Sequence, residues 1–265
     1  MRAALLALVL SLTTAACVQA QPAACPAPKA MRFEVTGQIR RSDLAFTEGL
    51  EFHDGALYDS SGDLFGTSRV TRIDPATGKA TVLYDSGHRY FGEGLTIFND
   101  RIYQMTWREH RVFLRDMSGK ALKEFRNPRD GWGLTHDGRR LIASDGSDRL
   151  FFLRPSDFAT TGSVAVREGS QAINQINELE YVDGAVFANV FETWRVLKID
   201  PGTGCVLAAA DLSALHGRFA EADRDIIDAE SNFVLNGIAH DPKTGLFTVT
   251  GKYWPVLFTG RFVEP

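Results

Sequence analysis

From Phe33 onward, short hydrophobic runs alternate with turn sequences, which predicts strands rather than helices. In the first complete unit we expect strands at 49–52, 56–60, 69–73 and 79–84. The runs are rich in Val, Ile, Leu, Phe and Tyr, as half-buried strands are. The turn Asp74-Pro75-Ala76-Thr77-Gly78 precedes the last of these strands. Asp bonds to nearby backbone, Pro presets φ and Gly takes a positive φ, so this sequence is typical of a tight turn.

A four-residue phrase recurs at the start of five such units. It is Glu48-Gly49-Leu50-Glu51, Glu93-Gly94-Leu95-Thr96, Trp132-Gly133-Leu134-Thr135, Asn177-Glu178-Leu179-Glu180 and Asn236-Gly237-Ile238-Ala239. Its second residue recurs after 45, 39, 45 and 59 residues. A period near 40–50 residues made of strands is typical of a β-propeller. We therefore predict an all-β, five-bladed β-propeller, in which the first residues of the five phrases form a ring at one end of a central channel.

The last repeat contains only three expected strands, at 237–240, 246–250 and 256–263. The N-terminal run 32–40 has strand character but belongs to no repeat of its own. We expect this run to become the fourth strand of the last blade, because that pairing closes the ring and leaves no free edge there.

The longest interval contains a segment, 211–231, whose apolar residues are spaced more like a helix than a strand. We predict a short helical insertion, with Asp211 as a candidate cap at its start. Two interpretations of this insertion stay open: a lid over the channel, or a surface elaboration without a role at the site.

Composition and charge narrow the function classes. The chain has 265 residues, of which 44% are hydrophobic and 23% charged, as in an ordinary soluble protein. The formal net charge is −4, and Lys and Arg form no basic run, so nucleic acid and anionic membrane surfaces are not expected partners. We expect one propeller domain over 32–265, a monomer, and no membrane span.

The N-terminal segment has the features of a signal peptide. A positive charge at Arg2 precedes an apolar stretch and small residues, and cleavage after Ala20 would leave an extended tail over 21–31. An alternative is a lipoprotein with Cys17 as its lipidated first residue. Either way we expect a periplasmic or secreted protein. Cys25 and Cys205 then have two open interpretations, a disulfide or two separate thiols.

Several familiar sites are absent from the sequence. There is no Gly-x-Ser-x-Gly elbow, no phosphate-binding loop and no dinucleotide fingerprint. The six histidines have no metal-ligand spacing. The candidate chemistry therefore lies in the ring, where Glu48 and Glu93 would be partly desolvated beside Trp107 and Trp132. Lys252, just after a strand of the last repeat, is expected to add a cation or hydrogen-bond donor.

At these residues the chain resembles the plant- and bacterial-type glutaminyl cyclases. The resemblance runs in order through all five repeats, over about residues 33–265. It is carried by Phe46-Thr47-Glu48-Gly49-Leu50-Glu51, Phe91-Gly92-Glu93-Gly94-Leu95-Thr96, Tyr103-Gln104-Met105-Thr106-Trp107, Gly131-Trp132-Gly133-Leu134-Thr135, Asn177-Glu178-Leu179-Glu180, Leu235-Asn236-Gly237-Ile238-Ala239 and Val249-Thr250-Gly251-Lys252-Tyr253-Trp254-Pro255.

The resemblance implies conversion of the N-terminal glutamine of peptides or proteins to pyroglutamate, with release of ammonia and no metal or other cofactor. It implies that Glu93 is the catalytic acid/base. It also implies that Asn177 and Lys252 hold the substrate amide, where both are expected to bond a developing oxyanion. It implies that Trp107, Trp132 and Trp194 bind substrate, and from their places in the ring we also expect Glu48 and Asn236 to do so. The family usually has Gln at the position of Glu48, so an added charge beside Glu93 is expected to shift a pKa or to pair with Lys252.

Two other function classes stay open from the residues alone. In a lactonase-like propeller hydrolase, a divalent metal would be held by the oxygens of Glu48, Glu93, Asn177 and Asn236. In a binding scaffold without catalysis, substitution of Glu93 would have no kinetic effect. Fold alone does not decide among these classes.

Overall fold

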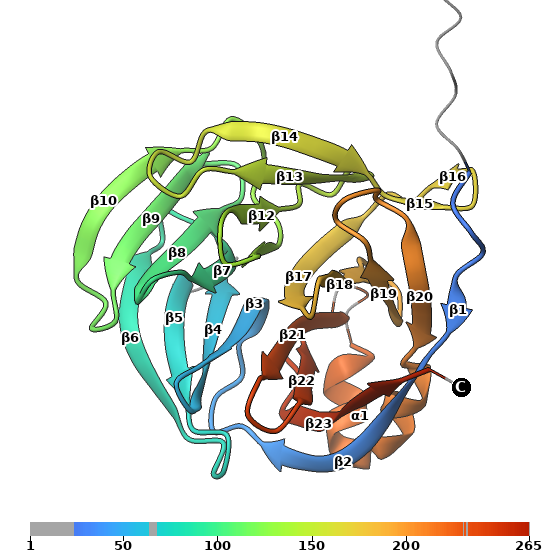
Figure 1. Cartoon of the computed structure of the whole chain (residues 1–265). Coiled ribbons are helices and arrows are strands. Elements are labelled where there is room, and N and C mark those ends of the chain that lie inside the picture. Colours follow the sequence, from blue (N-terminus) through green and yellow to red (C-terminus); the bar gives the residue numbers. More distant parts are fainter. Residues whose placement is uncertain (1–23, 64–67, 230, 232, 265) are drawn as a thin grey trace, which may run out of the picture.

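The computed structural model describes residues 24–63, 68–229, 231 and 233–264. Five sheets stand around a central axis as a five-bladed β-propeller, as predicted (Figure 1). The first blade consists of β3 (Phe46–His53), β4 (Ala56–Gly62), β5 (Ser68–Ile73) and β6 (Ala80–Gly87), and the second of β7 (Gly92–Ile97), β8 (Arg101–Thr106), β9 (Arg111–Asp116) and β10 (Ala121–Arg126). The third consists of β11 (Leu134–His136), β12 (Leu141–Ala143), β13 (Arg149–Leu153) and β14 (Thr160–Ala165), and the fourth of β17 (Ile176–Val182), β18 (Ala185–Val190), β19 (Arg195–Ile199) and β20 (Val206–Asp211). The fifth consists of β21 (Leu235–Asp241), β22 (Leu246–Gly251), β23 (Val256–Val263) and β2 (Arg32–Arg40). A small hairpin of β15 (Arg167–Glu168) and β16 (Gln171–Ala172) precedes the fourth blade.

The five repeated phrases form or adjoin the innermost strands β3, β7, β11, β17 and β21, which contact one another around the axis. In four of the five phrases the second residue is glycine, which permits this close approach, whereas the fourth phrase has Glu178 there. A Cβ on Gly49 would lie 2.7 Å from the backbone nitrogen of Leu95, and one on Gly133 would lie 2.1 Å from the backbone oxygen of Asn177. The repeat seen in the sequence is therefore a packing requirement of the channel wall.

The Asp-based turns form as their sequences predict. Asp74 accepts hydrogen bonds from the backbone nitrogens of Ala76 and Thr77, and Gly78 has a φ of 70°. Equivalent Asp bonds and positive-φ glycines occur in the turns at 200–204 and 241–245. These turns set the hairpins that build each blade.

The N-terminal strand closes the last blade, as predicted. β2 pairs antiparallel with β23 from Arg32 opposite Val263 to Arg40 opposite Val256. Before it, a short strand β1 (Lys29–Ala30) pairs in parallel with β20 of the fourth blade. A disulfide joins Cys25 to Cys205, so the first of the two interpretations of these cysteines holds. The expected signal peptide at 1–20 and Cys17 lie outside the described residues.

The insertion is helical, as predicted, with a 3₁₀-helix η1 (Ser213–Arg218) followed by α1 (Glu221–Ile227). Asp211 accepts a hydrogen bond from the backbone nitrogen of Ser213, although Leu212 occupies the N-cap position. Figure 1 shows α1 beside β23 and β2. Two hydrogen bonds of 2.7 and 2.9 Å between Arg40 and Asp223 join α1 to β2.

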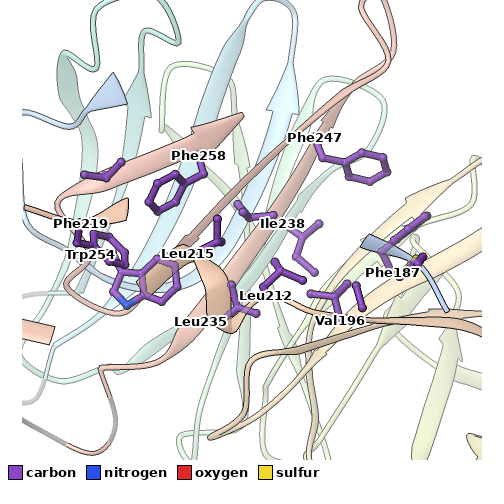
Figure 2. Close-up of a cluster of buried hydrophobic side chains, with 14 of the residues drawn as sticks. Phe187, Val196, Leu212, Leu215, Phe219, Leu235, Ile238, Phe247, Trp254 and Phe258 are labelled. Atoms are coloured by element: carbon purple, nitrogen blue, oxygen red, sulfur yellow. The ribbon is translucent and has the colours of Figure 1, made fainter. Parts of the chain in front are cut away.

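The apolar side of the insertion belongs to the largest hydrophobic cluster, between the fourth and fifth blades. Leu215 and Phe219 pack there with Trp254 and Phe258 (Figure 2). Burial of these side chains stabilises the insertion against the fourth and fifth blades by roughly 1.5–3 kcal/mol for each large residue. None of its described residues lines the pocket at the channel, which favours the surface elaboration over the lid. No described helix is long and apolar enough to cross a membrane.

Candidate functional site

Four of the five ring positions meet in one pocket at an end of the channel, and Asn236 lies behind its wall. The pocket has a volume of about 180 Å³. It is lined by Phe46, Glu48, Phe91, Glu93, Trp107, Trp132, Asn177, Phe191 and Lys252. Because the innermost strands run side by side around the axis, one short phrase repeated in sequence becomes one cluster in space.

Glu93, on β7, is the carboxyl group of this pocket that no described residue engages by a hydrogen bond. Its side chain is buried, and no donor among the described residues bonds to either carboxyl oxygen. Burial raises the pKa of Glu93 well above its usual value, the nearby Glu48 adds to the rise, and Lys252 opposes it. A carboxyl group that is buried, unengaged and open to a pocket has the properties required of a general acid or base.

Glu48, on β3, is by contrast fully engaged. Its Oε1 accepts a 2.8 Å hydrogen bond from Lys252 Nζ, and its Oε2 accepts a 3.0 Å bond from Asn236 Nδ2. Burial raises the pKa of Glu48, while the Lys252 ammonium and the Asn236 amide oppose the rise. Both outcomes expected for the added charge are therefore present: Glu48 pairs with Lys252 and adds to the raised pKa of Glu93.

Lys252 follows β22 and reaches the pocket between two aromatic rings. Its Nζ lies 4.5 Å from the ring centroid of Phe46 and 4.9 Å from that of Phe191. One of its three donors bonds to Glu48, which leaves N–H groups for a bound molecule. The rings and the carboxylate together hold the ammonium at the pocket wall.

Aromatic side chains form the other walls. The ring centroids of Phe91 and Trp107 are 5.7 Å apart, and those of Trp132 and Phe191 are 5.5 Å apart. The exposed Arg108 guanidinium covers Trp107 at 3.9 Å from the ring centroid. Two flat walls and one polar wall suit a small polar group joined to a short aliphatic chain.

Two of the residues predicted to bind substrate do not line the pocket. Asn236 is fully buried behind the wall, where its Oδ1 accepts a 2.9 Å hydrogen bond from Asn177 Nδ2. Trp194 packs on Trp254, with ring centroids 5.2 Å apart, in the cluster that also holds the helical insertion. The substrate roles of both residues stay predictions.

Three phenylalanines that line the pocket, Phe46, Phe91 and Phe191, were not predicted as site residues. Phe46 and Phe91 each stand two residues before a ring glutamate, so the repeat register itself points to them. Phe191 is the first residue after β18, as Trp107 is after β8 and Lys252 is after β22. Alignment of the second strands of the blades would therefore have identified Phe191.

The axial-metal alternative is not favoured by the donor set. The described residues contain no group of three or more His, Cys, Asp or Glu side chains that could hold a metal ion. Both oxygens of Glu48 are bonded, and the ammonium of Lys252 already lies within the proposed ligand set. A second cation beside Lys252 would be repelled.

The chain is similar in sequence and in fold to known proteins. Residues 6–262 match the sequence profile of the family described as glutamine cyclotransferase. A glutaminyl-peptide cyclotransferase of Arabidopsis thaliana is 36% identical over 228 residues, which are 85% of this chain and 69% of that protein. The crystal structure of Myxococcus xanthus glutaminyl cyclase matches with a TM-score of 0.77 and 32% identity, over 90% of this chain and 99% of that chain. With a five-bladed fold, an acid-containing aromatic pocket and these three agreements, the chain belongs to the glutamine cyclotransferase family.

Proposed function

We propose that the protein converts the N-terminal glutamine of peptides and proteins to pyroglutamate and releases ammonia, with Glu93 as the acid/base. The observation that carries this assignment is Glu93 itself, a buried carboxyl group that lines the pocket and has no hydrogen-bond donor among the described residues. Family membership supports the reaction class.

The reaction needs one proton to move between two nitrogens. As the α-amine nitrogen bonds to the γ-carboxamide carbon, the Glu93 carboxylate takes a proton from that nitrogen. The resulting carboxyl group gives the proton to the amide nitrogen as the carbon–nitrogen bond breaks, and ammonia leaves. A raised pKa serves both steps, because a catalyst works best when its pKa is near the working pH.

The other pocket residues orient the substrate and stabilise charge. Ring closure is intramolecular, so holding the glutamine side chain in a folded conformation between Trp107 and Trp132 supplies much of the rate. Lys252 donates to the carbonyl oxygen as negative charge develops on it. Asn177 bonds to the substrate amide. Asn236 bonds to Asn177 from behind the wall. Trp194, which packs on Trp254, stays a predicted substrate-binding residue.

We also propose that the protein works as a monomer in the periplasm or after secretion. The Cys25–Cys205 disulfide supports an oxidising compartment. The signal-like sequence at 1–20 agrees with export, and mass spectrometry of the mature N-terminus tests the cleavage after Ala20.

Ammonia release from a glutaminyl dipeptide by the purified mature protein tests the function. We expect release that persists in EDTA and is lost in Glu93→Gln. Inactive wild-type protein, or activity lost on chelation alone, would favour the metal hydrolase or the binding scaffold.

A further inference from the structure

A chain of hydrogen bonds runs behind the polar wall of the pocket in one direction. Asn177 Nδ2 donates to Asn236 Oδ1 at 2.9 Å. Asn236 Nδ2 donates to Glu48 Oε2 at 3.0 Å and also to the backbone oxygen of Thr47 at 2.9 Å. Lys252 Nζ donates to the other oxygen of Glu48. The chain therefore begins at Asn177 and ends on a carboxylate that also holds Lys252.

Chemistry fixes this direction. The backbone oxygen of Thr47 can only accept, so the atom of Asn236 that faces it must be the amide nitrogen. The other terminal atom of Asn236 is then its oxygen, and Asn177 must present its own nitrogen to that oxygen. Neither amide can rotate without placing like groups in contact, and this holds whether Glu48 is ionised or protonated.

Thr47 is itself held in place. Its hydroxyl donates to Asp59 at 2.7 Å and accepts a 3.0 Å bond from Arg41, and all three residues are buried. A 3.0 Å ion pair between Arg41 and Asp59 completes this support. The backbone oxygen that orients Asn236 therefore belongs to a fixed part of β3.

The direction of the chain leaves Asn177 Oδ1 as a hydrogen-bond acceptor in the pocket. Asn177 lines the pocket, its nitrogen is used by Asn236, and no described residue donates to its oxygen. The polar wall thus offers a fixed acceptor, Asn177 Oδ1, together with a donor, Lys252 Nζ. A primary carboxamide has the complementary pair, an N–H donor and a carbonyl acceptor.

We propose that Asn236 is a positioning residue that turns the oxygen of Asn177 toward the substrate, so that Asn177 binds the NH₂ of the γ-carboxamide while Lys252 binds its carbonyl oxygen. This arrangement selects N-terminal glutamine over N-terminal glutamate. The proposal rests on the proposed function. It gives Asn177 the role of an acceptor for the leaving nitrogen in place of the oxyanion donor that the sequence suggested.

The selectivity follows from an unpaired group. A γ-carboxylate has no N–H, so one of its oxygens would face the oxygen of Asn177 without a hydrogen bond. Sites built to bond a substrate N–H or O–H discriminate strongly against analogues that lack it. When Asn236 is replaced, the Asn177 amide can rotate and donate from its nitrogen to the γ-carboxylate. The discrimination between glutamine and glutamate then falls.

The test compares kcat/KM for glutaminyl and glutamyl dipeptides of otherwise identical sequence. In Asn236→Leu we expect the glutamine-to-glutamate ratio to fall by about tenfold or more, the factor of one hydrogen bond. Asn236→Ser removes the carboxamide without adding bulk, and serves if the leucine variant does not fold. Asn236→Asp retains an acceptor toward Asn177, so it is expected to restore part of the ratio at low pH, where the introduced carboxyl group is protonated.

Glu48→Gln is the matched control. Its amide oxygen still accepts from Asn236, and Thr47 still fixes that amide, so the chain keeps its direction while Lys252 loses its carboxylate. We expect lower activity and a glutamine-to-glutamate ratio that falls less than in the Asn236 variants, because the loss of a negative charge beside Lys252 also favours a γ-carboxylate. An unchanged ratio in a folded, active Asn236 variant overturns the proposal, and so does an equal fall of the ratio in Glu48→Gln. Failure of the proposed function is distinct, because the wild-type protein would then release no ammonia from the glutaminyl dipeptide.

Discussion

The pocket end of the channel and its deeper wall both contain buried glutamates, but the two regions use them differently. Glu93 lines the pocket and has no donor among the described residues. Deeper along the innermost strands, Glu178 accepts backbone hydrogen bonds from Leu50 at 3.1 Å and from Ile238 at 2.9 Å. Glu178 therefore joins the fourth blade to the first and the fifth, whereas Glu93 is free to exchange a proton.

A raised pKa does not by itself locate a catalytic group in this protein. Burial raises the pKa of Glu178 and of Glu180 well above the usual value, and raises that of Glu51 to about 7. Glu51 accepts from the backbone nitrogen of Ile97, and Glu180 from that of His240. Each of these three carboxyl groups accepts a hydrogen bond from the backbone of another blade, and the absence of such a bond among the described residues distinguishes Glu93.

Glu93→Gln is expected to give the largest effect. Loss of general acid/base catalysis should lower kcat/KM for a glutaminyl dipeptide by about 10²–10⁴-fold. The thermal midpoint should stay near that of the wild-type protein, because no hydrogen bond among the described residues is lost. Steady-state ammonia release and a thermal melt measure the two quantities, and retained activity would contradict the assignment.

Glu178→Leu should show the opposite combination of effects, with a large loss of stability in place of a specific loss of catalysis. It leaves the backbone N–H groups of Leu50 and Ile238 without partners, which should lower the free energy of unfolding by about 2–5 kcal/mol. Urea unfolding measures this loss, and Glu178→Gln, which keeps one acceptor, is the matched variant with a smaller loss. If the leucine variant is as stable as wild type but inactive, Glu178 belongs to the chemistry and the contrast between the two regions fails.

The buried glutamates of the deeper wall, Glu51 among them, should make the stability of the protein depend on pH. Since the folded-state pKa of Glu51 is raised to about 7, its contribution is full below about pH 4.5 and is lost as the pH rises through about 7. The change is up to about 3 kcal/mol. Glu51→Gln should flatten the fall of the urea-unfolding free energy over this range, while the exposed-strand variant Glu124→Gln should not. An unaltered pH profile in Glu51→Gln would count against a protonated Glu51 in the folded protein.

Glu48→Gln should move the pH–rate profile of the pocket. The charge of Glu48 contributes to the raised pKa of Glu93, and its loss also leaves Lys252 without a counter-ion. Both changes lower the pKa of Glu93, so the acidic limb of kcat/KM should move to lower pH. If the acidic limb of kcat/KM stays at the same pH or moves to higher pH, then that limb does not reflect the ionisation of Glu93.

The smallest effect is expected at Trp194. Its ring packs on Trp254 outside the pocket, whereas Trp107 lines the pocket. Trp194→Phe should therefore change KM for a glutaminyl dipeptide less than Trp107→Phe does. A larger effect at Trp194 would restore the direct substrate role that the family resemblance implies.

Local sequence was sufficient to predict most of the fold. The strands at 32–40 and 256–263, the blade number and the helical insertion were all predicted, because alternation, turn chemistry and repeat length act over short distances. The pairing of Cys25 with Cys205 was left open, because it depends on a distance set by the parallel pairing of β1 with β20. Phe191 was missed because its equivalence to Trp107 appears only when second strands are aligned.

A ring of five equivalent positions could be predicted from sequence, since a repeat of strands with a period near 40–50 residues closes around an axis. Which ring side chains are left without a hydrogen-bond partner depends on tertiary contacts. Glu48 and Glu93 occupy the same position in their phrases, yet Lys252 and Asn236 reach Glu48 alone. Those partners come from 188 and 204 residues away, and hydrogen bonds at such separations depend on how the blades pack.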